Sequence, residues 1–176
     1  MYFCQPLFPV HFPLYTLYMI ILSVDPGFER LGIAIIQKEK GQKETLVHSE
    51  CFKTSTKIPH HERLALVQNK FLEMIHTYKP EIFATETLLF SNNVKTALLV
   101  SEVRGILLAN ASTNNLNIFE YNPNTIKLAI TGYGKADKAQ VMDMVTKLIT
   151  VPEGKNSDDE LDAIAIGLTC IAIERF

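Results

Sequence analysis

The chain has 176 residues, of which 47% are hydrophobic and 20% are charged, and its formal net charge is −2. These values are typical of one globular domain and exclude a compositionally disordered, collagenous or disulfide-scaffold protein. The small negative charge, taken alone, argues against a general nucleic-acid-binding protein, which normally carries a basic excess. The three cysteines, Cys4, Cys51 and Cys170, have no CxxC spacing, so we expect free thiols in a reducing compartment, the cytoplasm.

The first 18 residues differ in composition from the remainder of the chain. They contain no charged side chain but six aromatic residues and three prolines, Pro6, Pro9 and Pro13, which are unfavourable in a helix. No Lys or Arg precedes the apolar stretch, as a secretory signal would require. We therefore interpret 1–18 as a disordered or non-native extension and 19–176 as a single domain.

The domain begins with three predicted strands and continues with alternating helices and strands. The strands are expected at 19–24, 31–37, 44–53, 81–85 and 116–121, and the helices at 60–78, 93–111, 123–130, 136–149 and 158–175. Three strands with short links predict an antiparallel meander, and the alternation that follows predicts parallel strands. The expected fold is α/β, with a mixed five-stranded sheet flanked by helices.

Acidic residues stand where two of these strands end. Asp25 follows the first strand and Glu86 the fourth, so the two carboxylates meet at one sheet edge if these strands are neighbours. Asp159 and Asp162 lie three residues apart on the mostly apolar last helix, and therefore share one face. Each acid also has an ordinary explanation, as a turn residue, a solvated strand end or a helix N-terminal acid. Together they favour a site for Mg²⁺, which prefers oxygen ligands.

Four segments in this order resemble the RuvC family of Holliday-junction resolvases, which are ribonuclease-H-like nucleases. The segments are IILSVDPGFERLGIAII, ATETLLFSNNVKTALLVSEVRGILLANA, YNPNTIKLAITGYGKADKAQV and DDELDAIAIGLTC. The resemblance covers essentially all of 19–176. It assigns the catalytic and metal-binding roles to Asp25, Glu86, Asp159 and Asp162; Asp158, one turn before Asp162, leaves the identity of the third acid slightly ambiguous.

The resemblance also implies an activity. A homodimer would make paired symmetric nicks in four-way DNA junctions during homologous recombination and DNA repair, with two Mg²⁺ ions per subunit that Mn²⁺ can replace. Its products would carry 5′-phosphate and 3′-hydroxyl ends, and its partner would be the RuvAB branch-migration complex.

Without the four acids the formal charge of the remainder is +2, so a near-neutral total is compatible with a DNA-binding nuclease.

Candidate DNA contacts lie in two segments. The stretch 123–147 carries four lysines against two aspartates, and Lys127, Lys135 and Lys138 are its candidate phosphate contacts. The loop 87–93 matches the family loop that enters the junction, with Leu89, Phe90 and Asn93 as candidates, although Leu89 replaces the usual aromatic residue. Arg104 is either a phosphate contact or a brace for its helix, and the apolar face of 93–111 belongs either to a dimer interface or to the core.

Three other classes of protein are alternatives to a resolvase. A YqgF-type nuclease of the same fold would act on RNA, but it lacks the full set of segments seen here. An ATPase of the actin or sugar-kinase type requires a second glycine-rich turn, whereas no glycine follows Glu86 until Gly105. A junction-binding module without catalysis would not need all four acids.

Overall fold

The computed structural model describes residues 18–88, 94–152 and 157–174. Its elements follow the chain in the order β1 Tyr18–Asp25, β2 Arg30–Glu39, β3 Thr45–Lys53, α1 His60–Tyr78, β4 Ile82–Glu86, α2 Val94–Thr113, β5 Asn117–Tyr121, α3 Pro123–Thr131, α4 Lys138–Leu148 and α5 Asp158–Glu174. Every predicted strand and helix is present, with ends that coincide or differ by at most two residues. Tyr18, which we assigned to the N-terminal extension, is the first residue of β1 and pairs with Glu39.

The five strands form one mixed sheet in the order β3-β2-β1-β4-β5. The strands β1, β2 and β3 pair antiparallel as the predicted meander, while β4 and β5 run parallel to β1. The fold prediction is therefore confirmed. Because β1 lies at the centre of the sheet, between β2 and β4, the end of this strand is bordered by elements from both halves of the chain.

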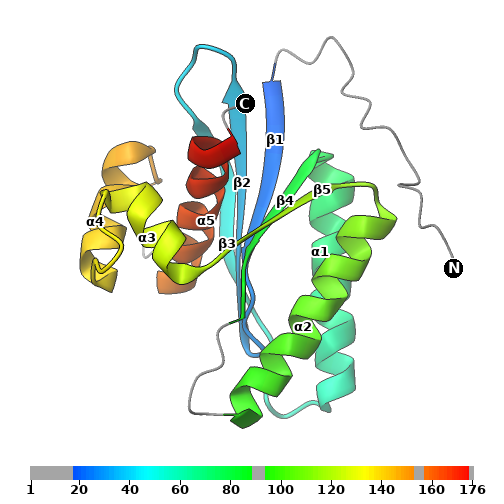
Figure 1. Cartoon of the computed structure of the whole chain (residues 1–176). Helices are drawn as coiled ribbons and strands as arrows, with labels where there is room; N and C mark the ends of the chain where they lie inside the picture. The colour runs from blue at the N-terminus through cyan, green and yellow to red at the C-terminus, as the bar shows by residue number, and fades with distance from the viewer. Residues whose placement is uncertain (1–17, 89–93, 153–156, 175–176) are drawn as a thin grey trace, which may run out of the picture.

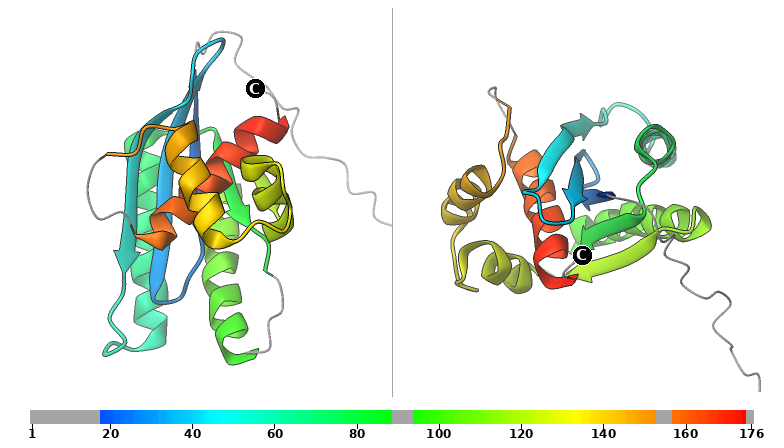
Figure 2. Two further views of the ribbon diagram at one scale, coloured as in Figure 1. Left: turned by 90° about the vertical axis from the view of Figure 1, so that its left-hand side faces the viewer. Right: turned by 90° about the horizontal axis from the view of Figure 1, so that it is seen from above.

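Helices cover both faces of the sheet (Figures 1 and 2). Side chains of α1 and α2, among them Phe71 and Leu107, pack on one face, and those of α3, α4 and α5, among them Val145 and Ile164, pack on the other. Neighbouring residues of β2 alternate between these two cores, as the period of a strand requires. The two-sided burial explains why the central strands are almost continuously apolar.

The ends of the helices follow from local sequence. Asn122 caps α3 by accepting a hydrogen bond from the Thr125 N–H, and Asp137 forms a capping box with Gln140 at the start of α4. The capping box explains why α4 begins at Lys138 and not at residue 136, where the apolar spacing begins. Part of the apolar face of α2 lies in the core of the domain, since Val103, Leu107 and Ala111 are buried against the sheet.

No helix among the described residues is long and apolar enough to cross a membrane.

Candidate active site

Asp25 and Glu86 lie side by side at one end of the central strands. The strands β1 and β4 are parallel neighbours, with Val24 opposite Thr85, so the next residue of each strand is the acid. The Thr85 hydroxyl donates a hydrogen bond to the Val24 carbonyl over 3.0 Å, which ties the two strands immediately before the acids. The prediction that these carboxylates meet at one sheet edge depended on strand adjacency, and that adjacency is confirmed.

The last helix, α5, packs closely against the sheet because glycines stand at two contact points. One glycine lies on the sheet and faces α5, and the other lies on α5 and faces the sheet. A Cβ on Gly32 of β2 would lie 1.9 Å from the Asp159 carbonyl oxygen, and a Cβ on Gly167 of α5 would lie 2.7 Å from the Ser23 hydroxyl oxygen. The helix begins with a capping box, in which the Ser157 hydroxyl accepts from the Glu160 N–H. This packing brings Asp159 and Asp162 to the end of the sheet that carries Asp25.

The charges of these acids, together with burial, shift one another's pKa values. Burial, together with the charges of Asp162, Glu86 and Asp159, raises the pKa of Asp25 from 3.8 to about 7. Burial and the charge of Asp162 raise the pKa of Glu86 from 4.5 to about 7, and burial also raises the pKa of Asp162. Acids from three separate elements therefore destabilise one another's charged forms, which is the situation that a bound cation relieves.

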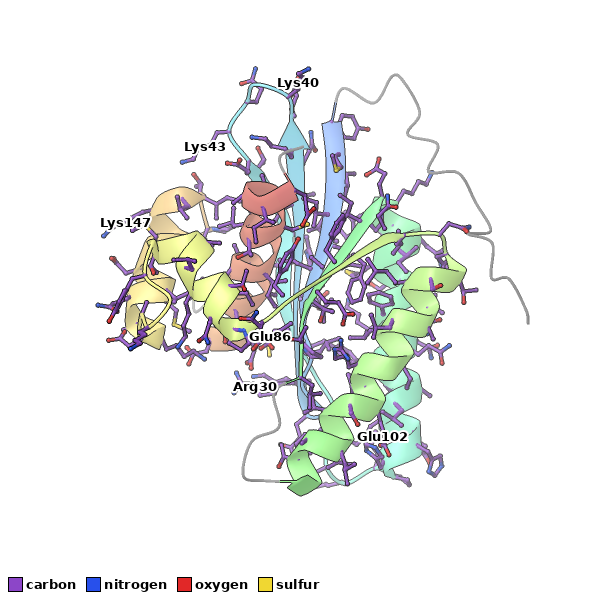
Figure 3. All side chains as sticks on the ribbon, viewed as in Figure 1. Arg30, Lys40, Lys43, Glu86, Glu102 and Lys147 are labelled. Carbon is purple, nitrogen blue, oxygen red and sulfur yellow. The ribbon has the colours of Figure 1, made fainter. Side chains whose placement is uncertain are left out.

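Cations of the chain already neutralise three acids of α5. The Lys138 ammonium lies 3.0 Å from Asp162 and 3.4 Å from Asp158, and the Arg30 guanidinium lies 2.5 Å from Asp159. Asp158 is thus the partner of a lysine at the rim of the site. Figure 3 places Arg30 and Glu86 near the same end of the sheet.

A cavity of about 260 Å³ opens beside the acids. Glu86 and Asp162 line it together with Lys127, Lys138 and apolar residues of α3, α4 and α5. Two of the three lysines that we predicted as phosphate contacts thus stand next to the acids, and the third, Lys135, is exposed just before α4. Lys147, in contrast, lies on the outer side of α4 and pairs with Asp143 (Figure 3).

Arg104 is engaged within the subunit. Its guanidinium pairs with Glu120 of β5, and its Nε donates to the Glu86 carbonyl oxygen over 3.2 Å. Of the two roles considered for Arg104, these contacts favour a brace for its helix, because they tie α2 to the ends of β4 and β5. The candidates from the loop 87–93, Leu89, Phe90 and Asn93, lie outside the described residues.

Sequence reasoning missed three residues around the loop that follows Asp25. The buried Arg63 of α1 donates to the Phe28 carbonyl oxygen over 2.5 Å and to the Thr54 hydroxyl over 3.0 Å, and thereby fixes this loop. Cys51 of β3 donates to Asp159 over 3.4 Å, and Arg30 pairs with the same carboxylate. Helical spacing was the signal that could have found Arg63, because it lies four residues before Val67 and eight before Phe71, on the buried face of α1.

The four acids fit a divalent metal by donor type and by charge, because they are oxygen ligands, and burial together with their mutual repulsion raises the pKa of Asp25. Their side chains do not form a ready coordination shell. Among residues 18–88, 94–152 and 157–174, no group of three or more His, Cys, Asp or Glu side chains is gathered closely enough to hold an ion. Asp159 instead pairs with Arg30.

The sheet order and the two helical layers define a ribonuclease-H-like protein. The family model "Crossover junction endodeoxyribonuclease RuvC" matches residues 21–170. This chain therefore belongs to the RuvC family, and the YqgF alternative is not favoured.

Curated relatives and solved structures agree with this family. The crossover junction endodeoxyribonuclease RuvC of Halothermothrix orenii is 39% identical over 150 residues, which cover 85% of this chain and 90% of the relative. The structure of Thermus thermophilus RuvC in complex with a Holliday junction substrate has a TM-score of 0.83 and 30% identity, covering 89% of this chain and 95% of that one. The yeast mitochondrial Holliday junction resolvase Ydc2, at 13% identity and a TM-score of 0.66, shares the fold over 91% of this chain and 80% of its own.

Proposed function

We propose that this protein is a Holliday-junction resolvase that makes paired symmetric nicks in four-way DNA junctions. The observation that carries the proposal is the convergence of Asp25, Glu86, Asp159 and Asp162 in a member of the RuvC family. In this reading the protein acts in the cytoplasm as a homodimer, with the RuvAB complex as a partner. The dimer would present one such acidic site to each of two strands of the junction.

The carboxylates would hold two Mg²⁺ ions per subunit, with Mn²⁺ as a substitute. Bound there, the metal would supply an activated water for attack on the phosphorus and would stabilise the leaving 3′ oxygen. Asp25 and Glu86 provide the rigid part of the ligand set, because each stands directly at the end of a buried strand. Asp162 approaches from α5, on the side of the cavity that Lys127 and Lys138 also line.

The lysines at the cavity would hold the DNA strand over the acids. Lys127 and Lys138 stand beside Glu86 and Asp162, so a phosphate that they contact lies within reach of the carboxylates. Lys135 extends this basic rim into solvent, where its contact would depend on the salt concentration. Leu89, Phe90 and Asn93 remain candidates for contacts inside the junction.

The decisive experiment is cleavage of a synthetic four-way junction in Mg²⁺. We expect symmetric nicks with ends that a DNA ligase reseals, while linear duplex of the same sequence is largely spared. Asp25→Asn should reduce cutting by more than about a hundredfold, because metal ions supply several kcal/mol of transition-state stabilisation, but should retain junction binding. Asp143→Asn, an exposed acid on α4, is the matched control and should cut normally.

Two results would contradict the proposal. Equal cutting of duplex and junction would indicate a general nuclease. Cutting by Asp25→Asn at the wild-type rate would contradict the assignment of the acidic site.

A further inference from the structure

Arg30 stands between the acidic site and solvent. It is the first residue of β2, and its guanidinium Nη2 lies 2.5 Å from the Asp159 Oδ2. The Cys51 thiol donates to the same oxygen over 3.4 Å. The Arg30 side chain is 49% exposed, whereas the Asp159 side chain is 24% exposed. A half-exposed cation thus holds the carboxylate that the proposed metal site also needs.

The ion pair and a metal ion compete for Asp159. A carboxylate oxygen held by a guanidinium is not free to coordinate a divalent cation, and the two positive charges repel each other. Asp25 and Glu86 differ, since neither forms an ion pair within the part of the chain that the structure describes. Among the described residues, the four acids are therefore divided into two without an ion-pair partner, Asp25 and Glu86, and two that pair with a cation, Asp159 and Asp162.

We propose that Arg30 is an exchangeable counter-ion: it holds Asp159 away from the metal site in the free protein and passes to a phosphate when DNA binds. The proposal rests on the proposed function, because the exchange needs a polyanionic substrate at this end of the sheet. Arginine suits the exchange, since its planar guanidinium binds carboxylate and phosphate with the same paired donors. Arg30 acts through Asp159 and is a positioning residue.

The exchange links metal binding to DNA binding. With Arg30 on a phosphate, Asp159 is free to rotate toward Asp25 and Asp162, so substrate raises the affinity for metal. By thermodynamic reciprocity, metal then raises the affinity for substrate by the same factor. The protein would thus assemble its full ligand set on DNA and leave it incomplete in the absence of DNA.

The first test measures metal binding without DNA, by electron paramagnetic resonance of Mn²⁺ titrated into the full-length protein. Arg30→Gln should bind Mn²⁺ about threefold to fivefold more tightly, the upper part of the range expected from loss of a partly exposed ion pair. Arg30→Lys, which keeps the charge, should stay within about twofold of wild type on the same grounds. Lys53→Gln is the matched control, because Lys53 is the register partner of Arg30 on β3 and forms no ion pair among the described residues.

The second test measures the Mg²⁺ concentration that gives half-maximal junction cleavage, at saturating junction. In wild type the DNA has already displaced Arg30, so Arg30→Gln should leave this midpoint unchanged. The proposal would be overturned if Arg30→Gln changed the Mg²⁺ midpoint by the same factor as the Mn²⁺ affinity. Arg30 would then compete with the metal equally in the presence and in the absence of DNA. Unchanged Mn²⁺ affinity in Arg30→Gln would also overturn it. Absence of cleavage by the wild type would refute the proposed function instead, because the Mn²⁺ titration does not depend on activity.

Discussion

Asp25→Asn should stabilise the metal-free protein while it removes cleavage. Burial and the charges of Asp162 and Glu86 raise the pKa of Asp25 from 3.8 to about 7. At 1.36 kcal/mol for each pH unit, this difference corresponds to about 4 kcal/mol between the charged and the neutral carboxyl. The Asp25 side chain is partly exposed, so solvent screening lowers the expected gain in the free energy of unfolding to about 1–3 kcal/mol.

The sign of the pH dependence follows from proton binding. Asp25 binds its proton more tightly in the folded state, so its own contribution to wild-type stability is largest below pH 3.8 and is lost as the pH rises through about 7. Asparagine does not titrate. The gain from Asp25→Asn should therefore be largest at pH 8, smaller at pH 5 and absent below the unfolded pKa.

Urea denaturation in EDTA, followed by circular dichroism at pH 8 and pH 5, measures this difference. Asp143→Asn removes an acid that is exposed and paired with Lys147, so it should change the free energy of unfolding by less than about 0.5 kcal/mol. The reasoning would be refuted if Asp25→Asn were less stable than wild type at pH 8, or if its gain were the same at both pH values.

Three further outcomes are expected. Gly32→Ala should cost about 1–3 kcal/mol of stability in thermal unfolding, because its Cβ would meet the Asp159 carbonyl oxygen at 1.9 Å and force α5 outward. Arg63→Met should cost about 1–3 kcal/mol, since it leaves the Phe28 carbonyl without its guanidinium donor, and urea denaturation should show this loss. Mg²⁺ at about a hundred times its dissociation constant should stabilise the wild type by about 2.7 kcal/mol over the protein in EDTA, a gain that Asp162→Asn should reduce.

The elements of this fold were predictable because their signals are local. Apolar runs closed by turn residues located all five strands, and the apolar spacing of 60–78 matched α1 residue for residue. Element boundaries were less accurate where capping decided them, as at α4, whose start is set by the Asp137–Gln140 pair and not by apolar spacing. Tyr18 was misplaced for a similar reason, since only pairing with Glu39 makes it part of β1.

By itself, the sequence determined which acids stand at strand and helix ends, because an acid directly after an apolar run is a local pattern of residue types. These acids and the segments around them also indicated the family. Only the tertiary structure decided which charges neutralise them. The adjacency of β1 and β4 brings Asp25 beside Glu86, and the close approach that Gly32 permits brings Asp159 to Arg30 across 129 positions of chain. Such contacts depend on the order of the strands and on the distance between helix and sheet. Both arise from packing of the whole chain and cannot be inferred from the local spacing of apolar and charged residues.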